Sequence, residues 1–388
     1  MRFLHTSDWH AGKTVGERSR AAELAAVLDE VVGIAKEERV DAMLVAGDLY
    51  EHRSPSPEAE ETVLGALARL YEARIPVVAI PGNHDNERRL GAIGGALRPL
   101  GIHIVPRVGP PATGTVVEIA SRDGSEAMLV ACVPFVPERK FGDAKALFDS
   151  TESWHQAYAE GLADLFAAMA QAFRDDRVNV LMAHVFTDGA LLGGGERDLS
   201  LGLGQTYAVA PSRLPPTAQY VALGHLHRPQ AVRGSPAPAR FSGSPLQLDF
   251  SETAHDKSVC VVEASPGRPA SVREVAIRGG RRLLDLEGTL DDLRSKAASV
   301  GDAYLRVTVR TDGPVPGIAD EVRAFLPNAL QVRPKYERAE EVDVATGVLK
   351  LRRREQFAAY YRRKHGAAPE DALVAAFAEV LAAEEGAA

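Results

Sequence analysis

The chain has 388 residues, 45% of them hydrophobic, which is enough for one large core and at least one accessory domain. Its net charge of −8 and its pI of about 5.8 argue against a simple electrostatic DNA-binding protein. The charge is unevenly distributed, because residues 333–365 contain ten Lys or Arg and five Asp or Glu, a local net charge of +5 that leaves −13 for the remainder.

The two cysteines and the start of the sequence bear on the compartment. Cys132 and Cys260 both lie in apolar, strand-like runs, so no disulfide framework is expected and a reducing compartment fits. Met1 leads directly into a strand-like segment without an apolar leader, and no apolar run has membrane-spanning length. The sequence therefore predicts a cytoplasmic protein with no membrane association.

The first part of the chain alternates between strand and helix patterns. An apolar stripe of helical period covers residues 24–34, and a longer one covers Trp154–Phe173. Strands are expected at residues 3–4, 42–46, 77–80, 102–105, 116–119, 128–133, 178–182 and 220–223. The βαβα order predicts a largely parallel sheet, and a second sheet of short strands is expected to continue to about Ile277. The predicted fold class is α/β, with a β-sandwich flanked by helices.

The pattern changes after Gly279-Gly280. Residues 283–332 alternate strand and helix and predict a small βαβαβ unit, followed by two helices around 352–364 and 372–383. The last helix carries an apolar stripe at Leu373, Phe377, Val380 and Leu381, which is typical of a helix that folds back on its core or docks on a partner. The predicted domains are 1–278, 279–336 as a capping unit, and 337–388 as a partner-binding segment.

Five short polar clusters recur along the chain, most of them after an apolar strand-like run. They are Asp8-Trp9-His10, Gly47-Asp48, Gly82-Asn83-His84-Asp85, Ala183-His184 and Gly224-His225-Leu226-His227. Carboxylate, amide and imidazole groups in such a set can hold two divalent metal ions side by side. The clusters therefore predict a metal-dependent phosphoester hydrolase.

A two-metal site needs one carboxylate shared by both ions and separate ligands for each ion. Asp48 is the expected bridge. One site would be completed by Asp8, His10 and His227, and the other by Asn83, His184 and His225. Extended backbone, on which residues two apart point the same way, would explain the Asp8-x-His10 and His225-x-His227 spacings.

Glycines 47, 82 and 224 are expected to let the backbone turn sharply beside the metals. A lone histidine on a strand is more often a structural residue than a ligand, so the prediction depends on the whole set in this order. The remaining histidines lack this context and are interpreted as structural or surface residues: His5, His103, His155, His255 and His365.

The chain resembles the calcineurin-like metallophosphoesterase superfamily and, more closely, the nuclease subunits of a bacterial DNA repair complex. The segments that carry the resemblance are Met1–His10, Val45–Asp48, Pro81–Asp85, Ala222–His227 and Gly243–Pro245. The first three motifs are shared by the superfamily, whereas the Thr6–His10 opening and the domain order are typical of the nuclease subunits. The resemblance implies 3′→5′ exonuclease action on duplex ends and endonuclease action on single strands and hairpins. It also implies manganese, a partner ATPase that controls access of DNA, and a homodimer within a heterotetramer.

The mixed nitrogen and oxygen donors independently favour Mn²⁺ over Mg²⁺, although iron and zinc also fit. His84, next to the ligand Asn83, is predicted to be the general acid that protonates the departing 3′ oxygen, with a supporting role for the metal ligands as the alternative. Some relatives carry His or Asp three residues after the bridging Asp. Here that position is Glu51, with His52 one further on, and we expect Glu51 to be a carboxylate that orients His84. Arg228 and residues 242–244 are interpreted as a solvated arginine and a plain turn rather than as phosphate contacts.

Two alternatives remain open. A phosphatase or phosphodiesterase for proteins or small molecules would use the same metals, but residues 47–52 lack the Asp-Arg-Gly extension typical of protein phosphatases, and such an enzyme would not need the additional domain. A non-catalytic scaffold would usually have lost ligands, and all seven are present here together with His84.

Overall fold

The structure is a computed structural model that describes residues 1–137, 151–193, 208–336, 353–365 and 368–385. The chain divides into two compact units, Met1–Val309 with Gly317–Arg333, and Arg310–Pro316 with Pro334–Ala388. Among the helices of the described residues, none is long and apolar enough to cross a membrane.

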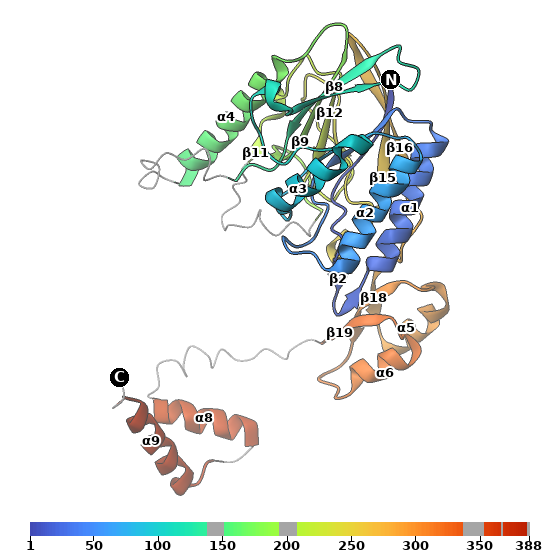
Figure 1. Cartoon of the computed structure of the whole chain (residues 1–388). Helices are drawn as coiled ribbons and strands as arrows, with labels where there is room; N and C mark the ends of the chain where they lie inside the picture. Colours follow the sequence, from blue (N-terminus) through green and yellow to red (C-terminus); the bar gives the residue numbers. More distant parts are fainter. Residues whose placement is uncertain (138–150, 194–207, 337–352, 366–367, 386–388) are drawn as a thin grey trace. The chain divides into compact units, whose positions relative to one another are not determined.

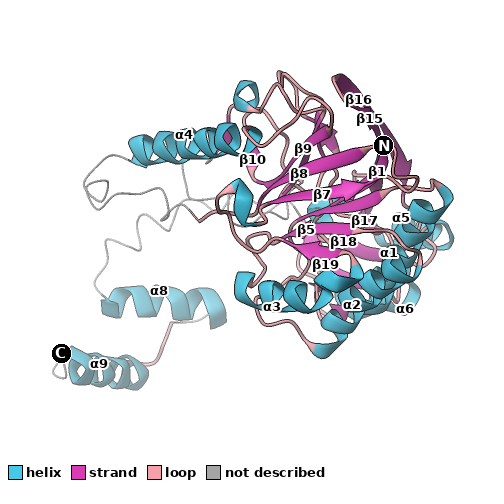
Figure 2. Ribbon diagram, turned by 45° about the horizontal axis from the view of Figure 1, so that its top comes forward, coloured by secondary structure: helices cyan, strands magenta, loops and turns pink. Residues whose placement is uncertain are grey.

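The first unit is built on two six-stranded sheets that pack face to face (Figure 2). The first sheet has the order β16-β15-β1-β4-β5-β6, and β1, β4, β5 and β6 run parallel. Its strands are β1 (Arg2–Thr6), β4 (Ala42–Ala46), β5 (Val77–Ile80), β6 (Ile102–Ile104), β15 (Ser258–Ser265) and β16 (Arg268–Ala276). The apolar runs of β4 and β5 are buried along their whole length because both faces of the sheet are covered.

The second sheet has the order β13-β14-β12-β9-β8-β7, with β8, β9, β12 and β14 parallel. Its strands are β7 (Val116–Ala120), β8 (Ala127–Val133), β9 (Val178–His184), β12 (Tyr220–Gly224), β13 (Gln230–Ala231) and β14 (Ala239–Phe241). Two short pairs stand apart, β2 (Thr14–Val15) with β3 (Arg18–Ser19) and β10 (Phe186–Thr187) with β11 (Ala208–Val209).

Helices cover the outer faces of the sandwich (Figure 1). On the first sheet lie α1 (Ala21–Glu37), α2 (Pro57–Glu72) and α3 (Glu87–Leu97), whose apolar stripes share one core with β1, β4 and β5. On the second sheet lies α4 (Thr151–Ala170), which packs Leu162 and Phe166 against it. The fold is thus the predicted α/β sandwich with flanking helices.

One part of the predicted topology is wrong. The sequence predicts that the strands up to Ile277 belong to the second sheet, but β15 and β16 join the first sheet, where β15 pairs antiparallel with β1. The physical reason is that β15 is buried over nearly all of its length and completes the free side of β1. Strand-like composition shows that a strand forms but does not show which edge it joins.

A small three-stranded sheet follows in the order β17-β18-β19 and matches the predicted βαβαβ pattern. Its elements are β17 (Leu283–Gly288), α5 (Leu290–Lys296), β18 (Tyr304–Arg310), α6 (Ile318–Phe325) and β19 (Ala329–Lys335). Thr289 and Asp292 begin α5 with a capping box, in which each side chain bonds the other residue's backbone N–H. The small sheet has its own core, which includes Leu293, Leu305 and Val322.

Short 3-10 turns connect several elements, namely η1 (Arg98–Leu100), η2 (Pro111–Thr113), η6 (Pro211–Arg213), η7 (Phe250–Glu252) and η8 (Ala297–Ser299).

The second unit contains α8 (Arg353–His365) and α9 (Asp371–Glu385), whose bounds are close to those of the two predicted helices. Phe357 of α8 stacks on Phe377 of α9 with ring centroids 4.2 Å apart, so the two helices pack on each other.

Candidate metal centre

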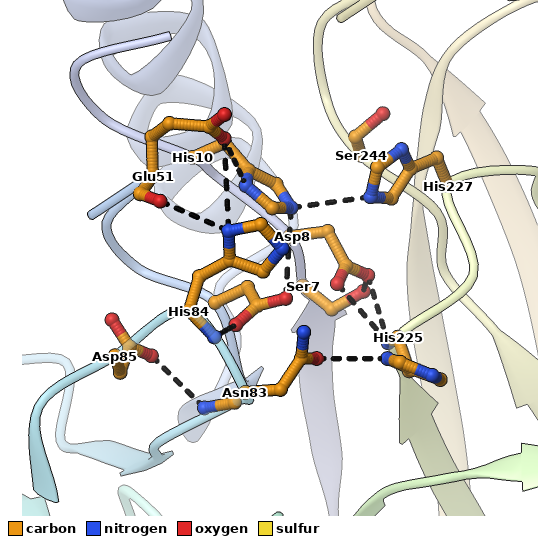
Figure 3. A network of polar contacts seen from close by, with 12 residues as sticks. Ser7, Asp8, His10, Glu51, Asn83, His84, Asp85, His225, His227 and Ser244 are labelled. Carbon is orange, nitrogen blue, oxygen red and sulfur yellow. Dashed lines mark hydrogen bonds and ion pairs between the residues drawn. The ribbon is translucent and has the colours of Figure 1, made fainter. Parts of the chain in front are cut away.

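The predicted polar clusters lie where parallel strands end. Asp8 and His10 follow β1, Asp48 follows β4, and Asn83 follows β5 in the first sheet. In the second sheet His184 is the last residue of β9, and the cluster at 224–227 ends β12. Parallel strands bring their carboxyl ends to one edge of a sheet, and here the edges of the two sheets meet. Figure 3 shows the resulting network of side chains.

The structure brings all seven predicted ligands together. Two groups of donor atoms, Asp8 with His10 and His227, and Asp48 with His184 and His225, each lie within 4.8 Å of one another. A third group joins His10, Asp48 and His84, so the first two groups are adjacent. The remaining predicted ligand, Asn83, directs its Oδ1 to within 3.1 Å of His184 Nε2 and 3.0 Å of His225 Nδ1.

The facing imidazoles of His10 and His227 show whether this group of residues can bind a cation. His10 Nδ1 lies 2.8 Å from a Glu51 carboxylate oxygen, and His227 Nδ1 lies 2.8 Å from a Glu252 carboxylate oxygen. A carboxylate accepts a hydrogen bond, so each Nδ1 carries the proton and each Nε2 presents a lone pair. The two Nε2 atoms are 3.1 Å apart. Two lone pairs that converge at this distance need a proton or a metal ion between them, and with Asp8 beside them the pair fits a divalent metal ion.

His184 is oriented in the same way, because its Nδ1 donates to the main-chain oxygen of Ala46 at 2.8 Å and its Nε2 lies 3.3 Å from Asp48 Oδ2. Burial lowers the pKa of His184, but Asp48 raises it to about 9, so a metal ion would replace the Nε2 proton. Burial, followed by the neighbouring His184, lowers the pKa of His225 to about 3, so that ring is neutral, as a metal ligand must be. Carboxylate, amide and neutral imidazole donors together suit a divalent transition metal.

Asp48 belongs to the second group, faces His10 of the first and is almost fully buried. Its Oδ1 accepts the main-chain N–H of His84 at 2.9 Å, and its Oδ2 faces His184 and His10 at 3.3 and 3.6 Å. Burial raises the pKa of Asp48, but the neighbouring imidazoles, His184 foremost, lower this pKa by more than burial raises it. The carboxylate therefore stays ionised. This position is the one that a shared ligand needs.

The extended backbone predicted for the two spacings is wrong. Four candidate ligands have positive φ: Asp8 (53°), His10 (47°), Asp48 (49°) and His225 (99°). Non-glycine residues in this region cost about 1–3 kcal/mol each, and such strain is concentrated at functional sites. The positive φ at His225 also turns its side chain away from that of His227, so the two histidines belong to different donor groups.

Two of the three glycines are needed for close packing rather than for a turn. A Cβ at Gly82 would overlap the Asp48 carboxylate, and a Cβ at Gly224 would overlap a main-chain carbonyl and reach to 3.0 Å from His184 Nδ1. Only Gly47 has a positive φ, of 100°, and a Cβ there would also overlap the His184 ring.

The predicted role of Glu51 must be corrected. Its carboxylate binds His10 Nδ1 at 2.8 Å and Lys13 Nζ at 2.7 Å, whereas His84 Nδ1 lies 4.0 Å from the nearer carboxylate oxygen. His84 Nδ1 donates instead to the main-chain oxygen of Glu51 at 2.9 Å. Burial raises the pKa of Glu51, but the hydrogen bond from His10 and then Lys13 lower it to about 2. The Glu51 side chain therefore orients a predicted metal ligand, and its backbone orients His84. The neighbouring His52 is exposed.

Sequence analysis missed three buried charged residues of the site. Glu252 is fully buried, and its carboxylate binds His227 Nδ1 and, at 2.7 Å, Lys257 Nζ. Asp85 accepts the main-chain N–H groups of Leu49, Tyr50 and Gly82 at 2.9–3.1 Å and so ties together the loops after β4 and β5. Burial, and then Asp48, raise the pKa of Asp85 to about 7. Asp85 stood within a noted motif, whereas no signal in the sequence marks Glu252 or Lys257.

Of the histidines set aside by sequence analysis, His5, His103 and His255 are described and are not among the grouped donors. His5 is buried and binds Tyr220 Oη at 2.9 Å, and the side chains of His155 and His365 lie outside the described residues. Ser242 is more than a plain turn residue, because its hydroxyl lies 2.8 Å from that of Ser7, which donates to Asp8 at 2.5 Å.

Two adjacent groups of metal donors with a buried carboxylate between their imidazoles, at the ends of the parallel strands of a mixed β-sandwich, are typical of a metallophosphoesterase. A family model described as calcineurin-like phosphoesterase matches residues 1–229. A second model, described as type 5 capsule protein repressor C-terminal domain, matches residues 280–365.

Relatives cover most of the chain. The SbcD subunit of the nuclease SbcCD from Bacillus subtilis is 32% identical over 99% of this chain and 99% of its own length. The same subunit from Rhodobacter capsulatus is 32% identical over 86% of this chain and 85% of its own length. The subunit from Escherichia coli K12 is 29% identical over 88% of this chain and 87% of its own length. The chain belongs to the calcineurin-like phosphoesterase family and, within it, to the SbcD family.

Replacing Gly82 by Ala tests the close packing beside Asp48. The new Cβ would displace the Asp48 carboxylate, so Gly82→Ala should lose both ions, as measured by metal analysis of the purified protein. Gly95→Ala is the matched control, because nothing lies within 4 Å of its Cβ, and it should retain the parent's metal content. A folded Gly82→Ala variant with full metal content would contradict this role of the glycine.

Glu51→Gln separates the two roles considered for Glu51. Because the carboxylate contacts His10, the variant should bind one of two ions about 10–100-fold more weakly and recover turnover at saturating metal. Titrating phosphodiesterase activity with Mn²⁺ measures both quantities. Unchanged metal affinity combined with lost turnover would return Glu51 to the role of orienting His84.

Proposed function

We propose that the chain is the nuclease subunit of an SbcCD-type complex and hydrolyses DNA phosphodiester bonds. The observation that carries the proposal is the convergence of seven donor side chains in two adjacent groups, with Asp48 of the second group 3.6 Å from His10 of the first. The name of the relatives, which match over up to 99% of this chain, supports DNA as the substrate and an SbcC-type ATPase as the partner. A DNA-processing enzyme of this kind acts in the cytoplasm.

The proposed metal is manganese, bound as two ions. One ion would be held by Asp8, His10 and His227, the other by Asn83, His184 and His225, and Asp48 would contact both. The mixed imidazole and oxygen donors support Mn²⁺ over Mg²⁺, and Fe²⁺ fits the same donors. When bound, the ions supply Lewis acidity to the phosphodiester and acidify water.

His84 is the proposed general acid. Its Nδ1 proton is held by the main-chain oxygen of Glu51, which leaves Nε2 as the atom that can carry a proton to a leaving oxygen. The His84 side chain is 27% exposed, whereas those of His10 and His184 are at most 1% exposed, so His84 can reach a substrate. Its ring lies 4.8 Å from that of His10, close to the proposed metals.

The proposed mode of action is 3′→5′ exonuclease cleavage of duplex ends and endonuclease cleavage of single strands and hairpins. The proposed assembly is a homodimer within a heterotetramer. The proposed domains are the nuclease domain 1–278, a DNA-binding capping domain 279–336 and a partner-binding segment 337–388. A phosphatase of the same superfamily remains the alternative and would have no use for the small sheet or the helical pair.

Replacing His84 and Asp48 separately tests the proposed division of roles. His84→Ala should retain both ions and lose turnover by ~10²–10⁴-fold, because it removes proton transfer only. Asp48→Ala should lose metal as well as activity. Metal analysis and cleavage of labelled hairpin DNA with Mn²⁺ measure both effects. Near-normal turnover by His84→Ala would reject the general-acid role.

The substrate class is tested on the parent protein with the same metal. Duplex DNA, hairpin DNA and a small generic phosphodiester are incubated separately with the purified chain. Cleavage of both DNAs supports the nuclease, and the DNA products report the mode of attack. Turnover of the small diester alone, with intact DNA, would favour the alternative phosphodiesterase.

The proposed partner-binding element is the helical pair α8 and α9. Phe377, which sequence analysis placed on the apolar stripe of the last helix, is partly covered by Phe357, whereas Leu373 is 40% exposed and Tyr360 of α8 is 58% exposed. The side chains of Val380 and Leu381 lie outside the described residues. Arg362 and Lys364 are exposed on α8 and suit DNA or an acidic partner surface.

Deleting residues from Pro369 onward should abolish binding of the ATPase while leaving metal content and cleavage of small phosphodiesters unchanged. The truncation removes no proposed ligand and lies within the second compact unit. Gel filtration of the mixed subunits measures the complex. A large fall in the melting temperature of the isolated truncated chain would show that α9 supports the catalytic fold instead.

A further inference from the structure

The segment from Gln247 to Lys257 connects the proposed metal centre with the small C-terminal sheet. It contains the three-residue turn η7, which begins after Asp249, whose side chain accepts the N–H of Ser251. The turn has two inward-facing residues, Phe250 and Glu252, which are 2% and 0% exposed. These two side chains contact different parts of the protein, although they are only two residues apart.

Glu252 faces the metal centre. One carboxylate oxygen accepts the Nδ1 proton of His227 at 2.8 Å, and the other accepts Lys257 Nζ at 2.7 Å and the N–H of Leu248 at 3.0 Å. Lys257 also donates to the main-chain oxygen of His227 at 2.9 Å and to Ser244 Oγ at 2.8 Å. Both charges are thus paired and hydrogen-bonded, as buried charges must be. This arrangement leaves His227 little freedom to turn.

Phe250 faces the small sheet. It packs in one cluster with Val15 of β2, Leu283 of β17 and Tyr304 of β18. Arg306 of β18 lies over the Phe250 ring, 5.3 Å from its centroid, and donates to the Phe250 main-chain oxygen at 3.1 Å. The position of η7 is therefore set by its packing against the small sheet.

Gln247 joins the same two regions through hydrogen bonds. Its side-chain oxygen accepts the N–H of Leu283 at 2.7 Å, and its side-chain nitrogen donates to the main-chain oxygen of Glu252 at 3.0 Å. Buried Arg20 donates to the Gln247 main-chain oxygen and, at 2.6 Å, to that of Arg281. A continuous chain of buried contacts thus runs from β17 through Gln247 and Glu252 to His227.

We propose that Glu252 is the positioning residue of His227, and that packing of the small sheet against η7 sets its position and thereby the affinity of the Asp8, His10 and His227 group for a divalent ion. The inference rests on the metal centre of the proposed function. It adds a connection through which displacement of the small sheet changes metal binding at the group that contains His227, because the side chains of His184 and His225 contact Ala46 and Asn83 in other segments.

The test is a calorimetric titration of the metal-free full chain with Mn²⁺ alone. Glu252→Gln should weaken one of the two binding events about 10–100-fold. Arg306→Ala, which does not touch a proposed ligand, should weaken the same event about threefold or more. The matched control is Arg294→Ala. Arg294 also lies 5.3 Å from an aromatic ring, that of Phe325, and pairs with Glu321 of α6, so its contacts stay within the small sheet and its helices. This variant should leave both binding events unchanged.

A double variant tests whether the two residues act through one path. If they do, adding Arg306→Ala to Glu252→Gln should cause less than twofold further loss, whereas independent effects would multiply. In a His184→Ala background, which disables the other group, the remaining binding event should still respond to Arg306→Ala. Should Arg306→Ala fail to fold, Asp285→Asn weakens the same ion pair, in which Arg306 binds Asp285 at 2.6 and 2.7 Å.

Parent-like binding by folded Arg306→Ala, equal losses in Arg294→Ala, or multiplying effects in the double variant would each overturn the proposal. A parent chain that binds no Mn²⁺ would overturn it as well. The titration contains no DNA, so a metal affinity that does not respond to Arg306→Ala would leave the nuclease assignment standing. Conversely, a parent that fails to cleave DNA would leave the coupling to be judged by metal binding.

Discussion

The position of one proton on each imidazole governs the whole site. His10, His184 and His227 each donate Nδ1–H to a fixed acceptor, namely the Glu51 carboxylate, the Ala46 main-chain oxygen and the Glu252 carboxylate. Each acceptor directs the Nε2 atom of its ring to the centre, where a metal ion would take the lone pair. The facing Nε2 atoms of His10 and His227, 3.1 Å apart, would repel without a cation between them. The surrounding fold can be understood as a frame that holds these acceptors.

The β-sandwich supplies that frame because its two sheets contribute to the same site. β1, β4 and β5 end at one edge of the first sheet, and β9 and β12 end at one edge of the second. The loops that follow must then turn back within one or two residues, which explains the positive φ at Asp8, His10, Asp48 and His225. The large apolar core between the sheets offsets this strain, and Asp85 fixes the two central loops with three main-chain hydrogen bonds.

Much of this arrangement could be predicted from the sequence, because the ligands directly follow apolar strands and a parallel sheet brings strand ends together. The prediction was limited where the partner of a residue lies far away in the chain. Glu252 follows its partner His227 by 25 residues in an irregular segment, and nothing in the local pattern marks it. Glu51 was recognised in the sequence, but its carboxylate contacts His10 and its main-chain oxygen contacts His84. This difference between side chain and backbone is visible only in the three-dimensional structure. The edge joined by β15 was mispredicted for the same reason, since strand composition carries no information on pairing.

The pairing of β15 with β1 has a consequence for the order in which the protein can fold during synthesis. β1 is made first and finds β4 within about 40 residues, but its other neighbour spans Ser258–Ser265, roughly two thirds of the way along the chain. Until that strand leaves the ribosome, one side of β1 has unpaired N–H and C=O groups, which are a template for pairing with other chains. Glu252 and Lys257 are synthesised just before the same strand. The nascent chain therefore gains protection from aggregation and the last support of its metal centre in the same stage of synthesis.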